Sequence, residues 1–226
     1  MAAAVEMLRA AQIENGALVH DGQPVTSERL RRTIHSALME HDCTGQHTIV
    51  AGGQQGCDPH QEGHGPLCAS EPIIVDIFPK NDLSGYFGDI TRTFVKGPVP
   101  KRVRALYETV LEAQENALRQ VRAGAKGRAI HESVQAFFSA RGYETGDKDG
   151  YMQGYFHSTG HGLGLEIHEA PSLGQRGGEL QAGQVVTVEP GLYYRGLGGV
   201  RIEDTVVVRD EGIENLTTFP KYLDIP

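Results

Sequence analysis

The sequence has no apolar run of about 18 residues or more, the length that a membrane-spanning helix requires, so it predicts no such helix. Its first residues, MAAAVEMLRAAQIENG, also lack a basic start, and Glu6 and Arg9 interrupt their apolar side chains. We expect this segment to form an amphipathic helix and not a signal peptide.

Cysteine is scarce and has no paired spacing. The three cysteines, Cys43, Cys57 and Cys68, cannot all pair with one another, and no C-x-x-C occurs. This usage excludes a structural zinc ribbon, argues against a disulfide framework and suits a cytoplasmic protein. The formal net charge of −8 comes from an excess of acidic residues and argues against a nucleic-acid partner.

Two common site signatures are missing as well. No Gly-Lys-Ser/Thr occurs, so the glycines of 52–56 and 160–164 do not predict a phosphate-binding loop. His157 and His161 have the spacing of a zincin pair, but no H-E-x-x-H is present. Each glycine around them would also cost a helix about 1 kcal/mol, so a zincin helix is not expected.

The chain of 226 residues, 39% of them hydrophobic, predicts one domain over residues 1–226 with a sizeable core. Hydrophobic spacing and end signals predict helices over 2–13, 27–41, 101–122 and 127–140. Strands are expected over 47–52, 73–78, 86–95, 155–169, 184–189 and 199–208, with 73–78 and 86–95 paired as a hairpin. This order favours an α+β fold with an antiparallel sheet covered by helices.

Four acidic residues adjoin β-rich apolar segments: Asp76 in IVDIFP, Asp89 in YFGDITRTF, Glu189 in VVTVEPG and Glu203 in GVRIEDTVVV. Taken alone, Asp76 could occupy an exposed alternate position of a half-buried strand, and each glutamate could form a salt bridge at a strand edge. A carboxylate inside an apolar run is costly to bury without a positive partner. The four together therefore indicate bound cations.

Three histidines, His157, His161 and His168, lie close together in HSTGHGLGLEIHE, among glycines that let the backbone approach a ligand. A functional site is favoured there over three structural histidines. His161 and the four acids form a donor set that suits two hard divalent cations. Four carboxylates balance two such cations, and a bridging hydroxide could then exist at neutral pH and act as nucleophile.

A polar loop carries two more histidines in DPHQEGHGPL. His60 is favoured as a site residue, whereas His64 is expected to be solvated. Asp82 lies in KNDLSG, where an Asn-Asp pair beside Ser-Gly is ordinary turn chemistry, so no ligand role is expected for it.

The segments IVDIFP, GYFGDITRTF, HSTGHGLGLEIHE, VEPGLYY and VRIEDTV occur in the same order as in the pita-bread metallopeptidases, and they resemble the catalytic domain of that family. The match covers residues 25–215. Aminopeptidase P and prolidase resemble it most, with methionine aminopeptidase and creatinase further off. The resemblance implies a pita-bread fold and two divalent metal ions, manganese first, with cobalt or zinc as alternatives. Those relatives also carry a long N-terminal domain, which this chain is expected to lack.

The resemblance also implies a role for each matching residue. The implied metal ligands are Asp76, Asp89, His161, Glu189 and Glu203. The implied catalytic residues are His60, which lines the site, His168, which stabilises the reacting carbonyl, and Glu189 or Glu203, which passes a proton to the leaving nitrogen. The implied substrate-side residues are His157, which contacts the substrate, and Tyr193 and Arg201, which lie near the glutamate ligands.

The expected function is that of a cytoplasmic metallo-aminopeptidase that removes the N-terminal residue from peptides with proline second. The alternatives are a prolidase-type Xaa-Pro dipeptidase, a non-catalytic binding protein on the same scaffold, and a creatinase-like amidinohydrolase. The complete set of five ligands counts against the last two. A peptide is the expected partner, no nucleic acid or membrane is expected, and a homodimer is the assembly that the resemblance suggests.

Overall fold

The computed structural model describes residues 1–226 and gives four α-helices and eighteen strands. The helices are α1 (Ala2–Ala10), α2 (Ser27–Met39), α3 (Lys101–Leu118) and α4 (Gly127–Ala140), with a 3₁₀ turn η1 (Gly53–Cys57). The strands are β1 (Gln12–Glu14), β2 (Ala17–His20), β3 (Gln23–Pro24), β4 (Cys43–Gly45), β5 (Ile49–Gly52), β6 (Ile73–Ile77), β7 (Pro79–Asn81), β8 (Ile90–Lys96), β9 (Gly146–Lys148), β10 (Tyr151–Gln153), β11 (Gly160–Gly162), β12 (Glu169–Leu173), β13 (Val185–Val188), β14 (Gly191–Tyr194), β15 (Gly198–Arg201), β16 (Asp204–Arg209), β17 (Gly212–Asn215) and β18 (Asp224–Ile225).

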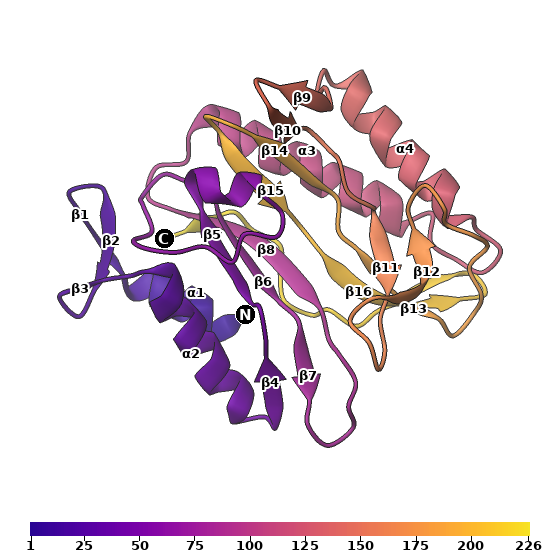
Figure 1. Cartoon of the computed structure of the whole chain (residues 1–226), viewed down its shortest axis with the longest axis horizontal. Helices are drawn as coiled ribbons and strands as arrows, with labels where there is room; N and C mark the ends of the chain where they lie inside the picture. The colour runs from indigo at the N-terminus through magenta and orange to yellow at the C-terminus, as the bar shows by residue number, and fades with distance from the viewer.

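The N-terminal half is built on a four-stranded sheet in the order β18-β8-β6-β5. Helices α1 and α2 contribute Leu8, Leu30 and Ile34 to a core that also contains Val75 and Phe94 from the sheet. Thr26 is the N-cap of α2, and its Oγ1 accepts a hydrogen bond from the Arg29 amide. Figure 1 shows both helices beside these strands.

The C-terminal half is built on a five-stranded sheet in the order β12-β11-β13-β16-β17. Helices α3 and α4 supply Val110 and Phe138 to the larger core, which continues through Val186 and Val206 of this sheet. The hairpin β14-β15 lies between the halves, where Tyr193 packs against Ile49 and Ile74 of the first sheet. The two sheets lie side by side in Figure 1, with β8 of the first next to β16 of the second.

The predicted hairpin of 73–78 and 86–95 is confirmed, because β6 pairs antiparallel with β8 from Ile73↔Phe94 to Ile77↔Ile90. The α+β expectation is confirmed, although the sheet is divided into two main sheets and several two- or three-stranded ones. None of the helices has the length and hydropathy needed to cross a bilayer.

Several expected elements differ in extent. The helices expected over 27–41 and 101–122 end at Met39 and Leu118, the strand expected over 86–95 begins at Ile90, and the one expected over 199–208 is divided into β15 and β16. The helix expected over 2–13 ends at Ala10, because residues from Gln12 onward pair with β2 across a turn in which Asn15 and Gly16 both have positive φ. An Asn-Gly pair is a strong hairpin signal that the apolar pattern around it obscured. The strand expected over 155–169 is limited to β11 and the first residue of β12, and the loop over 163–168 between them contains His168.

Candidate metal centre and active site

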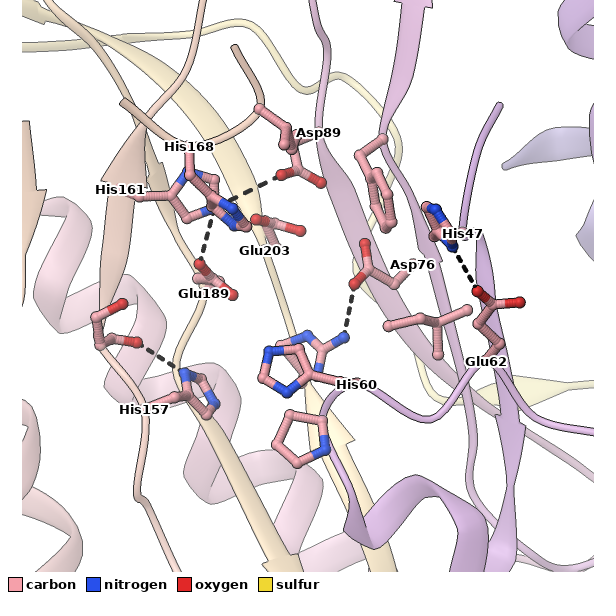
Figure 2. A pocket seen from close by; sticks show the side chains of 16 residues that line it. His47, His60, Glu62, Asp76, Asp89, His157, His161, His168, Glu189 and Glu203 are labelled. Carbon is pink, nitrogen blue, oxygen red and sulfur yellow. Dashed lines mark hydrogen bonds and ion pairs between the residues drawn. The ribbon is translucent and has the colours of Figure 1, made fainter. Parts of the chain in front are cut away.

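A cavity of about 420 Å³ lies between the two halves of the molecule, within the size range of small-molecule sites. Figure 2 shows Asp89, His161, Glu189 and Glu203 gathered together with Asp76 beside them, while His47 and Glu62 lie further to one side. The residues that line the cavity are His47, Ile49, Pro59, His60, Glu62, Asp76, Phe78, Asp89, His157, Ser158, His161, Ile167, His168, Glu189, Arg201 and Glu203. All five residues expected as metal ligands are among them.

The first sheet contributes two aspartates to this cavity. Asp76 is buried in β6, and its Oδ2 accepts a hydrogen bond of 2.6 Å from Arg201. Asp89 immediately precedes β8, the strand that pairs with β6. The Oδ1 atoms of both aspartates are buried without a hydrogen-bond partner. Each carboxylate therefore keeps a buried oxygen that a positive ligand could satisfy.

The second sheet contributes His161 from β11. Its Nε2 lies 3.2 Å from Glu189 Oε1 and 3.7 Å from Asp89 Oδ2, while its Nδ1 lies 3.1 Å from the Gly162 carbonyl oxygen. When Nδ1–H donates to that carbonyl, Nε2 is the nitrogen presented to the acids, as in metal-binding histidines. One ligand atom each from His161, Asp89 and Glu203 lie within 4.8 Å of one another.

The glycines beside His161 are required by the close packing of β11 between its neighbouring strands. A Cβ at Gly160 would lie 1.9 Å from the Thr187 carbonyl oxygen of β13, and one at Gly162 would lie 2.5 Å from the Ala170 carbonyl oxygen of β12. These glycines allow β11 to fit between its two neighbours. The sequence interpretation, in which they let the backbone approach a ligand, is therefore corrected.

Neighbouring side chains hold the two glutamates. Glu189 follows β13, and its Oε1 lies 3.2 Å from Thr187 Oγ1, which donates to it. Glu203 lies between β15 and β16, and its Oε2 accepts a hydrogen bond of 2.7 Å from Thr91 Oγ1. The buried Arg92 donates a hydrogen bond to the Glu203 carbonyl oxygen and forms an ion pair with the Asp204 carboxylate. These two contacts fix the backbone at Glu203.

The electrostatics of this cluster show a surplus of negative charge. Burial and the carboxylates of Glu189 and Asp76 raise the pKa of Glu203 to about 8. Burial and the neighbouring acids, Glu203 foremost, raise the pKa of Asp89 well above its usual range. Burial alone would lower the pKa of His161, but the hydrogen bond and charge of Glu189 raise it to about 9. Positive charge is therefore strongly favoured at this centre.

These observations fit two divalent cations. The donor set is four carboxylates and one imidazole, two of the carboxylate oxygens are buried and unpartnered, and the acids repel one another. Asp76, Asp89, His161, Glu189 and Glu203 would hold the cations, an oxygen-rich set of the kind that divalent manganese accepts.

The remaining histidines line the cavity in different ways. His60 and His168 are both in the wall, and the His168 ring lies 4.3 Å from that of His161, centroid to centroid, in an edge-on arrangement. His157 lies on the opposite side of Figure 2 from Glu62. His64 is exposed and does not line the cavity, as the sequence interpretation expected.

Tyr193 lies behind the cavity wall. Arg201 Nη1 donates to the Tyr193 hydroxyl at 3.0 Å, and that hydroxyl lies 2.8 Å from His157 Nε2. His157 Nδ1 lies 2.7 Å from the Ser158 carbonyl oxygen. Burial lowers the pKa of His157 to about 4, so the neutral ring accepts from Tyr193 and donates to Ser158. Tyr193 thus contacts two lining residues and is not itself placed in the cavity wall.

Sequence reasoning missed several residues of this site. Thr91 and Arg92 belong to the D-I-T-R-T segment, where their positions beside Asp89 were a usable signal for supporting roles. His47, Glu62 and Phe78 line the cavity through long-range packing of separate segments, and no local pattern marks them.

The pH dependence of stability tests the charge surplus. In metal-free protein, folded Glu203 and His161 titrate at about 8 and 9, above their ordinary values of 4.5 and 6.5. Between pH 6.5 and 8 the folded state therefore binds more protons than the unfolded state, and stability falls as the pH rises. The lowered pKa of His157 acts in the opposite direction only below pH 6.5.

Thermal unfolding of chelator-treated protein should show a loss of about 2 kcal/mol across this window for each titrating group. Added manganese should remove the loss, and Glu203→Gln should reduce it. A metal-free protein that becomes more stable from pH 6.5 to pH 8 would contradict this electrostatic account.

Comparison with known proteins identifies the family. The model of metallopeptidase family M24 matches residues 1–210 of the chain. The chain belongs to family M24. Members of this family are metallopeptidases, so a divalent metal centre and peptide hydrolysis are the chemistry of its relatives.

Individual M24 relatives agree in both sequence and structure. The chain is 38% identical to the uncharacterised peptidase YqhT of Bacillus subtilis and 37% identical to an Xaa-Pro dipeptidase of Pyrococcus furiosus, each over 78% of the chain and 48% of the relative. The X-Pro aminopeptidase of Thermotoga maritima superposes with a TM-score of 0.81 at 32% identity, over 89% of this chain and 55% of that one. These likenesses confirm the pita-bread fold, and the chain spans about half the length of the curated relatives it matches.

Proposed function

We propose that the protein is an aminopeptidase that removes the N-terminal residue from peptides whose second residue is proline. The catalytic unit is proposed to be one domain over residues 1–226. The observation that carries the proposal is the convergence of Asp76, Asp89, His161, Glu189 and Glu203 on one cavity. That convergence also counts against a non-catalytic scaffold, which has no need of a complete donor set.

The lining of the cavity favours an aminopeptidase over a dipeptidase. A dipeptide places its C-terminal carboxylate close to the reacting bond, so a dipeptidase site would need an arginine or lysine side chain there that has no other partner. Arg201 is the single arginine or lysine of the lining, and it is already bonded to Asp76 and Tyr193. Two divalent cations would balance four of the five carboxylates in the lining, and the fifth, Glu62, would repel a substrate carboxylate. A free amino terminus, in contrast, is not repelled by Glu62 and can bond to an acidic side chain of the lining.

The proposed roles of the chain's residues follow from their positions. Bound divalent cations would polarise the carbonyl and supply a water-derived nucleophile at neutral pH. His168, beside His161, donates a hydrogen bond to the reacting carbonyl oxygen, where negative charge develops. Glu203 or Glu189 carries the proton to the leaving nitrogen. Both nitrogens of His157 are occupied by Tyr193 and Ser158, so its ring face is left for packing against the proline.

His60 and Arg201 complete this proposal. His60 lies in the wall and contacts the bound peptide. Arg201 fixes Asp76 through its 2.6 Å bond and, through Tyr193, orients His157. Manganese is the cation that we propose first, because four of the five ligands are oxygen donors. We propose a cytoplasmic location, which the three free cysteines support.

A prolidase-type dipeptidase is the second candidate. It is favoured by one observation, the 37% identity to a relative that is an Xaa-Pro dipeptidase. The two candidates differ in the length of peptide that they accept, which makes them separable by one experiment.

Manganese-loaded protein should release one N-terminal residue from Ala-Pro-Ala and longer peptides, with weaker cleavage of the dipeptide Ala-Pro. Acetylation of the amino terminus should block cleavage, because it removes the charge that the carboxylates recognise. Mass spectrometry of the products measures both effects. Cleavage of Ala-Pro with Ala-Pro-Ala left intact would contradict the aminopeptidase proposal and show that the protein is a prolidase-type dipeptidase.

A further inference from the structure

Glu62 is a fifth carboxylate in the cavity wall, separate from the four carboxylates of the proposed metal centre. Figure 2 shows Glu62 and His47 together, on the side of Asp76 away from His161 and Glu189. His47 Nδ1 lies 2.7 Å from Glu62 Oε1. Four carboxylates already balance two divalent cations, so the charge of Glu62 is free for another purpose.

The backbone of Glu62 is held firmly at this position. Its carbonyl accepts hydrogen bonds from the Val50 amide at 3.0 Å and from Arg31, and the Gly63 carbonyl accepts from Arg31 at 2.9 Å. Gly63 has a φ of +80°, and a Cβ there would lie 1.9 Å from the Val50 carbonyl oxygen. Strand β5 and helix α2 therefore fix the point from which the Glu62 side chain reaches the cavity.

The Glu62 carboxylate is available to a ligand. Its one side-chain hydrogen bond is to His47 through Oε1, and Oε2 has no protein donor. The side chain is 45% exposed, and that of His47 is 76% exposed. Arg201, the one arginine or lysine of the lining, is bonded to Asp76. A ligand cation could thus bond Oε2 while His47 keeps Oε1.

The wall that leads to Glu62 suits a side chain with an apolar stem. Ile49 and Phe78 line the same cavity; Ile49 precedes Val50, whose amide bonds the Glu62 carbonyl, and Phe78 lies two residues beyond Asp76, the partner of Ile49 in the β5–β6 register. Lysine and arginine combine an aliphatic stem with a charged head, so the stem can pack on apolar surface while the head reaches a carboxylate. An aromatic ring such as that of Phe78 adds a favourable interaction with a cation.

We propose that this end of the cavity receives the side chain of the first peptide residue, and that Glu62 selects peptides beginning with arginine or lysine. The inference rests on the proposed function, in which the proline packs against His157 and the reacting carbonyl lies beside His168. His157 lies across the cavity from Glu62 in Figure 2, so the Glu62 side is left for the first side chain.

The test compares Arg-Pro-Ala with citrulline-Pro-Ala, in which the first side chain keeps its shape but has no charge. Manganese-loaded protein should show a kcat/KM about tenfold higher for the arginine peptide, the effect of one hydrogen bond between charged groups. Glu62→Gln should lower this ratio to about one, and Glu62→Lys should instead favour Glu-Pro-Ala over Gln-Pro-Ala. Glu211→Gln, at an exposed turn residue between β16 and β17, makes the same change in net charge and should keep the tenfold ratio.

A ratio near one in the unmodified protein, or an unchanged ratio in Glu62→Gln, would overturn the assignment. A preference that arises only when arginine is the third residue would also overturn it. If no Xaa-Pro peptide is cleaved, the proposed function fails, and calorimetric binding of the same two peptides to unmodified protein and to Glu62→Gln decides the role of Glu62. Loss of a binding preference in the variant supports the subsite, and equal binding by both proteins refutes it.

Discussion

Glu203→Ala should lose bound metal and peptidase activity together, with kcat/KM reduced roughly a thousandfold or more. The carboxylate of Glu203 lies with Asp89 and His161 in one group of ligand atoms within 4.8 Å. Removing it takes away a negative ligand, and stabilisation by a bound metal contributes several kcal/mol to the barrier of such reactions. At 1.36 kcal/mol for each tenfold change, that contribution corresponds to the expected loss.

Metal content by mass spectrometry, measured beside activity on Ala-Pro-Ala, checks this prediction. Asp89→Ala should behave in the same way. Asp82→Ala is the matched control, because it removes a carboxylate from an exposed turn, where the Asp82 side chain bonds only Thr44. It should keep full metal content and nearly full activity. A Glu203→Ala protein with normal metal content and turnover would show that Glu203 is not a ligand.

His168→Ala should keep its metal and lose about a hundredfold to a thousandfold in kcat, the range for removing one donor to a developing oxyanion. His168 lines the cavity from the loop after β11, and it contacts His161 edge-on with centroids 4.3 Å apart. It therefore lies near the centre without belonging to the closest group of ligand atoms.

The measurement is metal content together with kcat and KM for Ala-Pro-Ala. His168→Gln retains a side-chain donor and should recover part of the lost kcat at unchanged KM. Loss of metal in His168→Ala would show that the division of roles between His161 and His168 is wrong.

The proposed ligand set could be predicted from the sequence because its acidic members lie in unusual local settings. Asp76 interrupts an apolar strand, and Glu189 and Glu203 adjoin segments rich in valine, VVTV and TVVV. Such carboxylates need a positive partner whatever the fold. Their chemistry is therefore visible in the local sequence, and the structure places all of them on one cavity.

Other parts of the site depend on tertiary packing and have no local signal. Glu62 and His47 meet because β5 and the loop after η1 lie together, and Arg92 reaches Glu203 and the following residue from more than a hundred residues away. Tyr193 is in an identifiable segment, but only the fold shows that it lies behind His157 and Arg201. The turn at Asn15–Gly16 had a local signal, which the neighbouring helical pattern concealed.

Titration of metal-free protein with manganese tests the central claim most directly. Protein treated with a chelator and freed of it should be inactive on Ala-Pro-Ala. Activity should return as two equivalents of manganese bind to each chain, because four carboxylates and His161 surround one cavity. Full hydrolysis by the metal-free protein, or a return of activity without any manganese bound to the chain, would contradict the account.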